Sequence, residues 1–327
     1  MKKKIALVTG GYSGEAEISY KSAITVGNNV DTDKFDIYKI DINTTEWVYI
    51  NELGERTKVN KEDFSVIDCH GKTIQFDAIL LCIHGTPGED GKLQGYFDML
   101  GIPYTSCDAA TSALTFNKWF TVAVAAFGGI NVAKSLHLFK HTQVSPEEIV
   151  SKLQLPVFVK PNNGGSSLGI SKVNVFTELQ TALYKAFEVD DQVLVEEFIK
   201  GREFTIGVFK TKGQILTLPI TEIITKKEFF DFEAKYQGLS EEITPAVLDA
   251  TIATSISDAA VQVYKVLNCR GVVRIDFILE ATTVKPFMLE VNTVPGQSAA
   301  SIIPQQVKAY GWNLKDFYTA LIEEALL

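Results

Sequence analysis

Two apolar segments near the C-terminal end of the sequence each carry acidic residues. Residues 272–279 (VVRIDFIL) and 286–293 (PFMLEVNT) are rich in β-branched and aromatic residues, and a short polar stretch joins them. This pattern predicts a β-hairpin. Because side chains alternate between the faces of a strand, a hairpin symmetric about Thr283 pairs Asp276 with Glu290 and Arg274 with Asn292.

The predicted pairing places two carboxylates directly opposite each other, which destabilises a strand pair. A positive group is therefore expected between Asp276 and Glu290. A hard divalent cation bound by oxygen ligands fits best, with Asn292 on the same face. The alternative is a solvated outer sheet face that carries acids, but the flanking residues are almost all apolar.

Composition limits the classes of protein that the chain can belong to. Its 327 residues suffice for two or three domains, and the apolar content of 46% is ordinary for a globular protein. A net charge of −9 argues against a nucleic-acid partner. No apolar run reaches the length of a membrane span, and the run after the N-terminal lysines is too short for a signal peptide.

Cysteine usage indicates the redox environment and argues against structural zinc. The four cysteines form no C-x-x-C pair and no cluster with histidine. Cys82 and Cys269 lie in or beside apolar stretches, as expected for reduced core residues. We therefore expect a cytoplasmic protein.

The first third of the chain alternates strand and helix. The predicted elements are strands at 5–9, 35–42 and 76–83, and helices at 14–30, with Ser13 as N-cap, and at 92–100. This is the pattern of an open parallel sheet, whose ligands bind beyond the C-terminal ends of the strands. Both glycine-bearing loops, after Thr9 and after Ile83, fall at such ends.

The remainder of the chain alternates less regularly. We expect helices at 109–127, 146–153, 177–188, 245–267 and 313–326, and strands at 156–160, 170–174, 192–199, 203–209 and 215–220. Residues 221–238 form a polar, aromatic loop that is long enough for a functional lid. His137 and His141 are expected on the surface of a polar loop.

A glycine- and serine-rich loop, residues 162–169, joins two predicted strands. Glycines allow close approach to an anion, consecutive N–H groups form an anion-binding nest, and Ser166 and Ser167 add hydroxyl donors. Lys160 ends the preceding strand, and Lys118 lies in an otherwise apolar helical stretch. With a cation site elsewhere, these residues suggest a nucleotide triphosphate. The alternatives are an ordinary hairpin loop, a surface Lys160 and a Lys118 that extends to solvent.

Several acids have both a functional and a structural interpretation. Glu196 and Glu197 end a strand and point to opposite faces, so one can meet a ligand while the other meets solvent. Glu203 is a further acid close by. Glu15 either complements a helix dipole or binds a substrate ammonium. His84 occupies the second strand-end loop.

Seven motifs occur in order along nearly the whole chain. They are GGYSGEAEIS, HGTPGEDG, VFVKPNNGGSSLG, VLVEEFI with GREFT, FDFEAKY, GVVRIDF and FMLEVNTVPG. Together they resemble the D-alanine–D-alanine ligases of the ATP-grasp superfamily. The resemblance implies an α/β fold with a Rossmann-like N-terminal domain (1–104), a central ATP-grasp subdomain (105–191) and a C-terminal ATP-grasp subdomain (192–327).

The resemblance also implies how ATP is held. Lys118 and Lys160 would contact its phosphates, together with the loop of Ser166 and Ser167. ATP would lie between the central and C-terminal subdomains. Its adenine and ribose would lie against one segment of the chain: Glu196, Glu197, Phe198, Ile199 and Glu203. Asp276, Glu290 and Asn292 would hold two magnesium or manganese ions.

The remaining implied roles concern D-alanine. Glu15 would bind the ammonium of the first D-alanine, with His84 nearby, and Ser166 and Tyr236 would join Glu15 in a triad that fastens the lid. Arg274 and the Gly296 N–H would stabilise the oxyanion, and Ser301 would hold the carboxylate of the second D-alanine. The product would be D-alanyl-D-alanine for peptidoglycan, made through an acyl phosphate by a homodimer.

Some residues depart from the commonest pattern of that family. Phe230 replaces a frequent tyrosine, residues 297–300 (QSAA) replace a usual Met-Thr, and Asn117 replaces a common Asp. Lys235 and Tyr236 favour dipeptide formation over D-alanyl-D-lactate. A related ligase that uses D-lactate or another amino acid remains an alternative.

A third interpretation is a dinucleotide-binding oxidoreductase or a non-catalytic binding protein. It uses the partial glycine motif at residues 10–14, but Asp41 lies later than the usual acid and the C-terminal acids stay unexplained.

Overall fold

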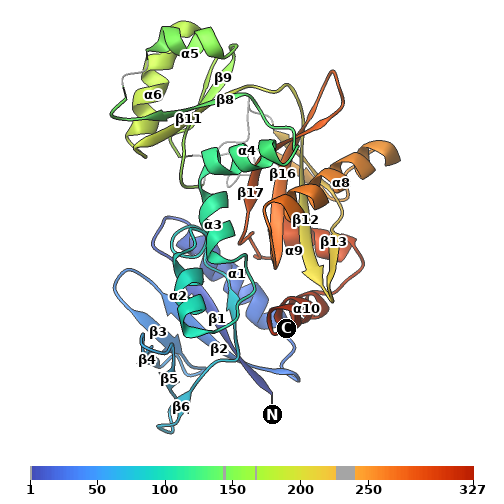
Figure 1. The fold of residues 1–327 in the computed structure, drawn as a ribbon. Helices are drawn as coiled ribbons and strands as arrows, with labels where there is room; N and C mark the ends of the chain where they lie inside the picture. Colours follow the sequence, from blue (N-terminus) through green and yellow to red (C-terminus); the bar gives the residue numbers. More distant parts are fainter. Residues whose placement is uncertain (1, 143–144, 166–167, 226–239) are drawn as a thin grey trace.

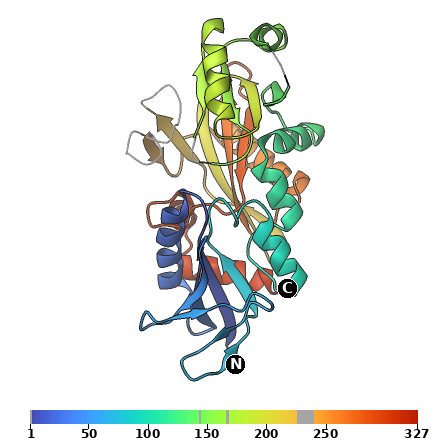
Figure 2. The same cartoon turned by 90° about the vertical axis from the view of Figure 1, so that its left-hand side faces the viewer.

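The computed structural model describes residues 2–142, 145–165, 168–225 and 240–327. Three larger sheets follow one another along the molecule (Figure 1). A five-stranded sheet from the N-terminal third lies at one end of the molecule and a four-stranded sheet lies at the other, as Figure 2 also shows. The third sheet is six-stranded. Among the described residues, no helix is long and apolar enough to cross a membrane.

The longest of the described helices is α8 (Ala250–Val266), with 17 residues. The other described α-helices are α1 (Ala16–Asn29), α2 (Lys92–Leu100), α3 (Ala109–Phe116), α4 (Lys118–Phe127), α5 (Pro146–Lys152), α6 (Leu179–Phe187), α9 (Ile302–Ala309) and α10 (Leu314–Ala325).

The strands divide among the sheets as follows. The N-terminal part contains β1 (Lys3–Gly10), β2 (Phe35–Ile42), β3 (Trp47–Ile50), β4 (Arg56–Lys58), β5 (Val66–Ile67), β6 (Thr73–Ile74) and β7 (Ala78–Leu81). The four-stranded sheet contains β8 (Ser135–Phe139), β9 (Val157–Pro161), β10 (Ser171–Val173) and β11 (Gln192–Glu197). The six-stranded sheet contains β12 (Gly201–Thr211), β13 (Gln214–Thr217), β14 (Thr221–Thr225), β15 (Ser240–Ile243), β16 (Val272–Glu280) and β17 (Pro286–Asn292).

The N-terminal sheet has the order β4-β3-β2-β1-β7, and only β2, β1 and β7 run parallel. Both faces of β1 are buried: Ile5 and Leu7 enter one apolar cluster, and Ala6 and Val8 enter another. The predicted parallel sheet is thus confirmed for its centre. The antiparallel strands β3 and β4 were missed because residues 47–58 lack a long apolar run.

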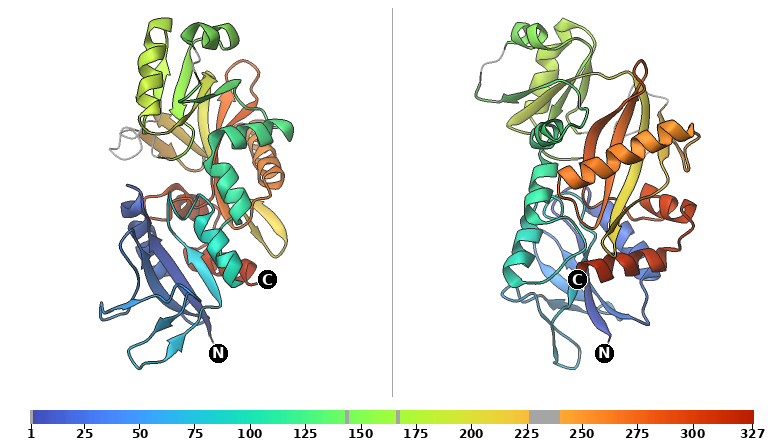
Figure 3. Two further views of the ribbon diagram at one scale, coloured as in Figure 1. Left: turned by 60° about the vertical axis from the view of Figure 1, so that its left-hand side comes forward. Right: turned by 45° about the vertical axis from the view of Figure 1, so that its right-hand side comes forward.

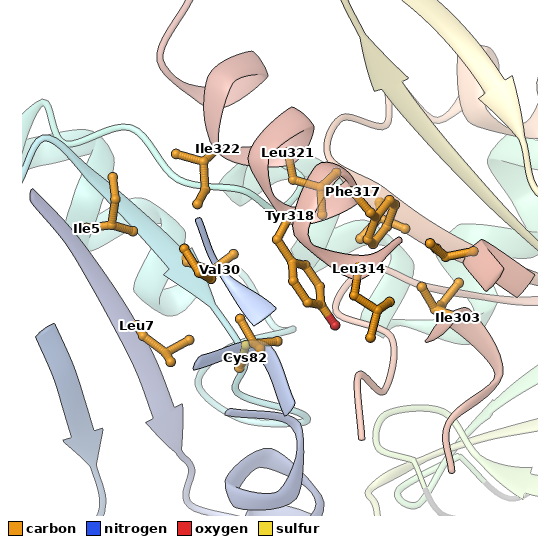
Figure 4. Close-up of a cluster of buried hydrophobic side chains, with 14 of the residues drawn as sticks. Ile5, Leu7, Val30, Cys82, Ile303, Leu314, Phe317, Tyr318, Leu321 and Ile322 are labelled. Atoms are coloured by element: carbon orange, nitrogen blue, oxygen red, sulfur yellow. The ribbon is translucent and has the colours of Figure 1, made fainter. Parts of the chain in front are cut away.

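One apolar cluster joins the N-terminal sheet to the C-terminal part of the chain. Helix α10 places Phe317, Tyr318 and Ile322 against residues of β1 and β7, and Figure 4 shows the two groups of side chains facing each other. Phe209 of β12 packs edge-on to Phe317, with ring centroids 5.2 Å apart. Burial of this apolar surface holds the first and last parts of the chain together.

The four-stranded sheet is antiparallel, with the order β10-β9-β11-β8. The glycine-serine loop lies between β9 and β10, so the prediction that it joins two strands is confirmed. Strand β11 pairs with β8 and β9, although the predicted boundary at 191/192 assigns it to the C-terminal subdomain. That boundary therefore cuts this sheet, and we now expect the division to follow β11.

The C-terminal hairpin has the predicted register. Arg274 pairs with Asn292 and Asp276 with Glu290, and the register shifts between Asp276 and Phe277. Helix α8 covers one face of this sheet (Figure 3, right), and its residues join β12, β16 and β17 in a common core. This helix starts at Ala250, five residues later than predicted.

The single helix predicted at 109–127 is wrong, because the chain bends at Asn117. Its φ of −93° and ψ of 107° end α3, and its side chain accepts a hydrogen bond from the N–H of Phe120 as the N-cap of α4. An isolated bridge joins Asn117 to Asn163 of the glycine-serine loop. Lys118 is therefore the first residue of a helix, beside that loop.

The surface-loop prediction for His137 is also wrong. His137 lies in the middle of β8, where its ring stacks on Trp119 at 5.3 Å and its Nε2 lies 2.9 Å from Oε1 of Gln192. The alternation of Leu136, His137 and Leu138 is short, and this explains why the segment was not recognised as a strand.

The cluster around α10 generates a stability prediction. Phe317→Ala removes a fully buried ring, so we expect the free energy of unfolding to fall by about 3–5 kcal/mol. Urea denaturation followed by circular dichroism measures this change. The matched control is Phe127→Ala, at a ring that is 96% exposed, which should change stability by less than about 0.5 kcal/mol. Equal effects of the two substitutions would contradict the packing role of α10.

Candidate active site

The charged face of the C-terminal hairpin contains a guanidinium between the two carboxylates. Arg274 donates from Nε to Oδ1 of Asp276 at 3.0 Å and from Nη2 to Oδ2 at 2.9 Å. The same Nη2 lies 4.0 Å from Oε1 of Glu290. Burial opposes ionisation of Arg274, but the Asp276 carboxylate outweighs it and raises the arginine pKa. The positive group expected between the acids is thus in part an arginine.

The hairpin also fits the expected divalent cation. Asp276 and Glu290 present carboxylates on one face, and the Asn292 amide lies 3.4 Å from Oδ2 of Asp276. Within the described ranges, no three residues among His, Cys, Asp and Glu form a closed ligand cluster. This open set of oxygen ligands suits magnesium, which usually keeps waters and substrate phosphates as its other ligands.

Thr205 of β12 fixes the orientation of Asp276. Its hydroxyl donates to Oδ1 of Asp276 at 2.5 Å, and both residues are buried. The two residues are cross-strand partners in the β12–β16 pair. Sequence reasoning missed Thr205, and only the observation that a threonine lies inside the GREFT motif could have indicated it.

A buried histidine connects the N-terminal sheet to the loop that follows β17. His84 lies 2.6 Å through Nδ1 from the carbonyl oxygen of Val294 and 2.9 Å through Nε2 from the hydroxyl of Ser22. Since a carbonyl only accepts, Nδ1 carries the proton and Nε2 accepts from Ser22. The Ser22 hydroxyl in turn accepts from the N–H of Gln297 at 3.0 Å. Burial, and secondarily the charge of Arg274, lower the pKa of His84 to about 4.

Glu89 completes this connection, which we call the His84 clamp (Ser22, His84, Glu89, Val294 and Gln297). Its carboxylate accepts from the N–H of Gly85 at 2.7 Å and from the N–H of Val294 at 3.2 Å. Loss of hydration, and then the neighbouring Glu15, raise the pKa of Glu89 to about 8. The clamp fixes the loop that carries Gly296. Neither Glu89 nor Ser22 was predicted as a site residue.

Glu15 lies where two glycine-bearing loops meet. A Cβ added to Gly85 would come within 2.6 Å of Oε2 of Glu15, and one added to Gly165 within 2.8 Å of Oε1. The N-terminal sheet and the glycine-serine loop therefore converge on this carboxylate. Glu15 is also the N-cap residue of α1, without a side-chain capping bond.

The predicted substrate-binding loop ends at the start of α9. Ser301 is the N-cap residue of α9, and its hydroxyl lies 2.7 Å from that of Ser298. A Cβ on Gly296 would come within 2.8 Å of the Ser301 hydroxyl, so these two residues are adjacent. Of the residues that depart from the usual Met-Thr, Gln297 joins Ser22 of the His84 clamp through its backbone N–H, and Ser298 contacts Ser301 through its hydroxyl.

The predicted phosphate-binding lysines surround the glycine-serine loop. Lys118 donates from Nζ to the carbonyl oxygen of Gly164 at 2.7 Å. Lys160 forms an ion pair with Glu196, and both side chains are largely buried. The loop is anchored by Asn162, which is fully buried and accepts from the N–H of Trp119. Asn162 was not predicted as a site residue.

The segment predicted to hold adenine and ribose begins at the end of β11. Glu196 and Glu197 do point to different sides, because Glu197 accepts from the N–H of Gln154 at 2.9 Å. The N–H of Phe198 donates to Pro156, so that amide is already used by the fold. The Phe198 ring lies 6.0 Å from that of Phe158. Ile199 follows directly, and Glu203 lies in β12 opposite Ile278.

Ser166, Ser167 and Tyr236 lie outside the described residues, as do Phe230, Lys235 and most of the predicted lid. For the described residues, the structure brings Glu15 together with the glycine-serine loop, and Arg274 with Asp276 and Glu290. The clamp joins His84 to the loop of Gly296.

The glycine motif at residues 10–14 serves packing. Gly10 has a φ of +102°, and a Cβ there would lie 2.3 Å from the carbonyl oxygen of Ile42. Asp41 accepts from the hydroxyl of Tyr20 at 2.8 Å. Both residues therefore have structural explanations, and the dinucleotide-binding interpretation loses its main support.

The three sheets, with a glycine-rich hairpin loop in one and a charged C-terminal hairpin in another, define an ATP-grasp fold. Residues 4–107 match the family model described as D-ala D-ala ligase N-terminus, and residues 120–323 match D-ala D-ala ligase C-terminus. The chain belongs to the D-alanine–D-alanine ligase family.

Individual relatives agree over the full length. The chain is 46% identical over 326 residues to a D-alanine–D-alanine ligase of Parabacteroides distasonis, covering 100% of this chain and 98% of the relative. It is 44% identical to that of Phocaeicola vulgatus, covering 99% of each.

Solved structures show the same similarity. The VanG D-Ala:D-Ser ligase from Enterococcus faecalis superposes with a TM-score of 0.90 at 34% identity, covering 99% of this chain and 100% of that one. A Bacillus anthracis D-alanine–D-alanine ligase complexed with ATP superposes with a TM-score of 0.79 at 29% identity, covering 99% and 97%.

The buried neutral His84 generates a prediction for the pH dependence of stability. Unfolded histidine takes up a proton below about pH 6.5, whereas the native imidazole does so only near pH 4. The unfolded state therefore binds more protons in this window, and stability falls as the pH drops from about 6.5 to 4, by at most about 3 kcal/mol. The expected result is that His84→Gln flattens this part of the curve.

Urea unfolding at several pH values between 4 and 8 measures this difference. His141→Gln, at an exposed histidine, is the matched control and should leave the curve unchanged. Parallel curves for the unmodified protein and His84→Gln would show that His84 is not held neutral.

Proposed function

We propose that this protein catalyses the ATP-dependent ligation of two D-alanines to D-alanyl-D-alanine, a peptidoglycan precursor, through a D-alanyl phosphate intermediate. The observation that carries the proposal is the match of both family models in order along the chain. The convergence of Glu15 with the glycine-serine loop, and of the His84 clamp with the loop of Gly296, supports it.

ATP would bind between the four-stranded and six-stranded sheets. Lys118 and Lys160 would offer ammonium groups to its phosphates, and the glycine-serine loop would offer N–H groups, including those of Ser166 and Ser167. To bind phosphate in this way, Lys160 must interact with both Glu196 and phosphate. Lys118 must replace its hydrogen bond to the Gly164 carbonyl with one to phosphate. Adenine and ribose would lie along residues 196–203.

The first D-alanine would lie against Glu15, whose carboxylate attracts its ammonium. Its own carboxylate oxygen attacks the γ-phosphorus of ATP, ADP leaves, and an acyl phosphate forms. Asp276, Glu290 and Asn292 would hold magnesium or manganese, which supplies positive charge for phosphoryl transfer when bound. The rest of the catalysis is positioning by the residues of the chain.

The second D-alanine would be held through its carboxylate by Ser301. Its amine attacks the acyl phosphate carbonyl, the new C–N bond forms, and phosphate leaves as the amine loses its proton. The oxyanion that develops needs preorganised donors. Arg274 and the Gly296 N–H would supply them, since Asp276 orients the guanidinium and the His84 clamp fixes the loop.

A cytoplasmic location is part of this proposal, because the reaction consumes ATP and all four cysteines are free thiols. The homodimer and the two-ion stoichiometry implied by the family resemblance also stay predictions.

The activity is tested by coupled measurement of ADP release. With ATP and magnesium, D-alanine should stimulate ADP release and yield one dipeptide per ADP. D-Lactate or D-serine, added at neutral pH beside limiting D-alanine, should yield a minor product, as expected for the dipeptide-forming class. Absence of D-alanine-dependent ADP release would refute the proposed function, and dominant ester formation would favour the D-lactate alternative.

The oxyanion role of Arg274 is tested by Arg274→Lys. Lysine keeps the charge but cannot donate in the same two-pronged way to Asp276, so the transition-state donor is displaced. We expect kcat to fall by about 10²–10³-fold, as for removal of other oxyanion donors.

The matched control for this substitution is Arg202→Lys. Arg202 also donates two bonds to a carboxylate, that of Glu222, each at 2.8 Å. We expect this control to retain kcat within about threefold, because the Arg202 side chain is half-exposed whereas that of Arg274 is largely buried. A similar loss in both variants would assign the effect to the sheet and not to the reaction.

A further inference from the structure

A fully buried glutamine of α9 lies at a break in the pairing of β12. Along one edge of β12, residues 203–205 pair with β14 and residues 208–211 pair with β13. The N–H of Gly207 falls in the interval between the two partner strands. It donates to Oε1 of Gln306 at 2.9 Å. The Gln306 side chain thus replaces a missing strand at this position.

The carboxamide of Gln306 contacts three backbone or side-chain groups of the sheet. Its Nε2 donates to the carbonyl oxygen of Thr205 at 3.0 Å and to the hydroxyl of Thr221 at 3.0 Å. Gln306 is 0% exposed. Loss of the amide would leave buried donors and acceptors of β12 without partners, which is costly.

Gly207 permits this close approach of α9. A Cβ at this position would lie 2.9 Å from Oε1 of Gln306 and 2.7 Å from Cδ1 of Ile303. The helix therefore packs directly onto the backbone of β12, and its position is fixed by hydrogen bonds as well as by apolar contact.

The contact between Gln306 and β12 connects two predicted site residues, Asp276 on the side of β12 and Ser301 on the side of α9. Thr205, whose carbonyl oxygen is held by Gln306, donates its hydroxyl to Asp276. Ser301 is the N-cap residue of α9, five positions before Gln306 and about 1.4 helical turns away. A shift of α9 along β12 would therefore change the distance between Ser301 and Asp276.

We propose that Gln306 is a positioning residue of the ligation reaction, which fixes the second-substrate loop at Ser301 relative to Asp276 through Thr205. The inference rests on the proposed function of this site. Gln306 touches neither substrate in this account, and none of its three partners is titratable. Its role is to define where the acceptor amine meets the acyl phosphate.

The first test is Gln306→Met, which preserves side-chain length and removes the three hydrogen bonds. We expect the D-alanine concentration for half-maximal ADP release to rise roughly tenfold or more, as for other buried partners left unpaired. The KM for ATP should change by less than about threefold, because Lys118, Lys160 and Glu196 belong to α4 and the four-stranded sheet, and Glu203 and Asp276 keep their pairing with neighbouring strands. A purely structural role would lower stability without this difference between substrates.

The matched control is Gln262→Met. Gln262 is an exposed glutamine of α8 that donates to one backbone carbonyl, that of Gly128. The Gln262→Met substitution should leave the KM values for D-alanine and ATP unchanged. Hydrogen exchange offers a readout besides activity: Gln306→Met should accelerate exchange at the Gly207 N–H, and Gln262→Met should not.

A second variant covers the case in which Gln306→Met does not fold. In Gln306→Glu, a neutral carboxyl can still donate one hydrogen bond and accept another, whereas the ionised form cannot donate. Activity relative to the unmodified protein should therefore be higher at pH 6 than at pH 8.5, with Gln262→Glu showing no such trend.

The outcomes separate the two proposals. Absence of D-alanine-dependent ADP release in the unmodified protein refutes the proposed function itself. If the unmodified protein is active, unchanged D-alanine dependence in Gln306→Met, or a pH-independent Gln306→Glu, overturns the role of Gln306. Equal increases in the KM values for D-alanine and ATP would also overturn it.

Discussion

The geometry of the candidate site depends on one buried, neutral imidazole. His84 can donate to Val294 and accept from Ser22 only in its neutral form, and burial maintains that form by lowering its pKa to about 4. Its bond to Val294 joins the loop after a parallel strand to a loop 210 residues later, and its bond to Ser22 joins it to α1. A charged imidazole would donate from both nitrogens, so the Ser22 hydroxyl would have to turn its own proton away and accept from Nε2 as well as from the N–H of Gln297. This connection holds the loop that carries Gly296.

The Arg274 guanidinium lies near both opposed acids of the C-terminal hairpin, so it neutralises them and is oriented by them. The sequence predicted a positive group between Asp276 and Glu290, and the structure places the Arg274 guanidinium there. The same register leaves carboxylate and amide oxygens on one face for a divalent cation. Arg274 and a cation would then share Asp276, with Thr205 holding the carboxylate in place. Neutralisation of the acids and orientation of Arg274, the proposed oxyanion donor, would thus be coupled.

Local patterns predicted the parts of the fold that local forces determine. The hairpin register, the central parallel strands and the glycine-rich loop between strands are confirmed, because alternation and glycine punctuation act over a few residues. The break at Asn117 was missed because it depends on a bridge to Asn163, 46 residues away. Thr205, Glu89 and Gln306 were missed for the same reason. Their partners lie in other elements, and no spacing in the sequence reveals them.

The contacts between the sheets differ in polarity: one is apolar and the other includes hydrogen bonds. The N-terminal and six-stranded sheets share a continuous apolar cluster around Phe317 and Tyr318, which resists relative movement. The apolar cluster of the four-stranded sheet contains described residues of that unit alone. Its contacts with the rest include hydrogen bonds such as those of Asn162 and Lys118. Hydrogen bonds exchange with water and phosphate more readily than packed apolar surfaces separate, so the proposed ATP would enter at this polar contact. The apolar contact would meanwhile keep Arg274, Gly296 and the His84 clamp in a constant arrangement.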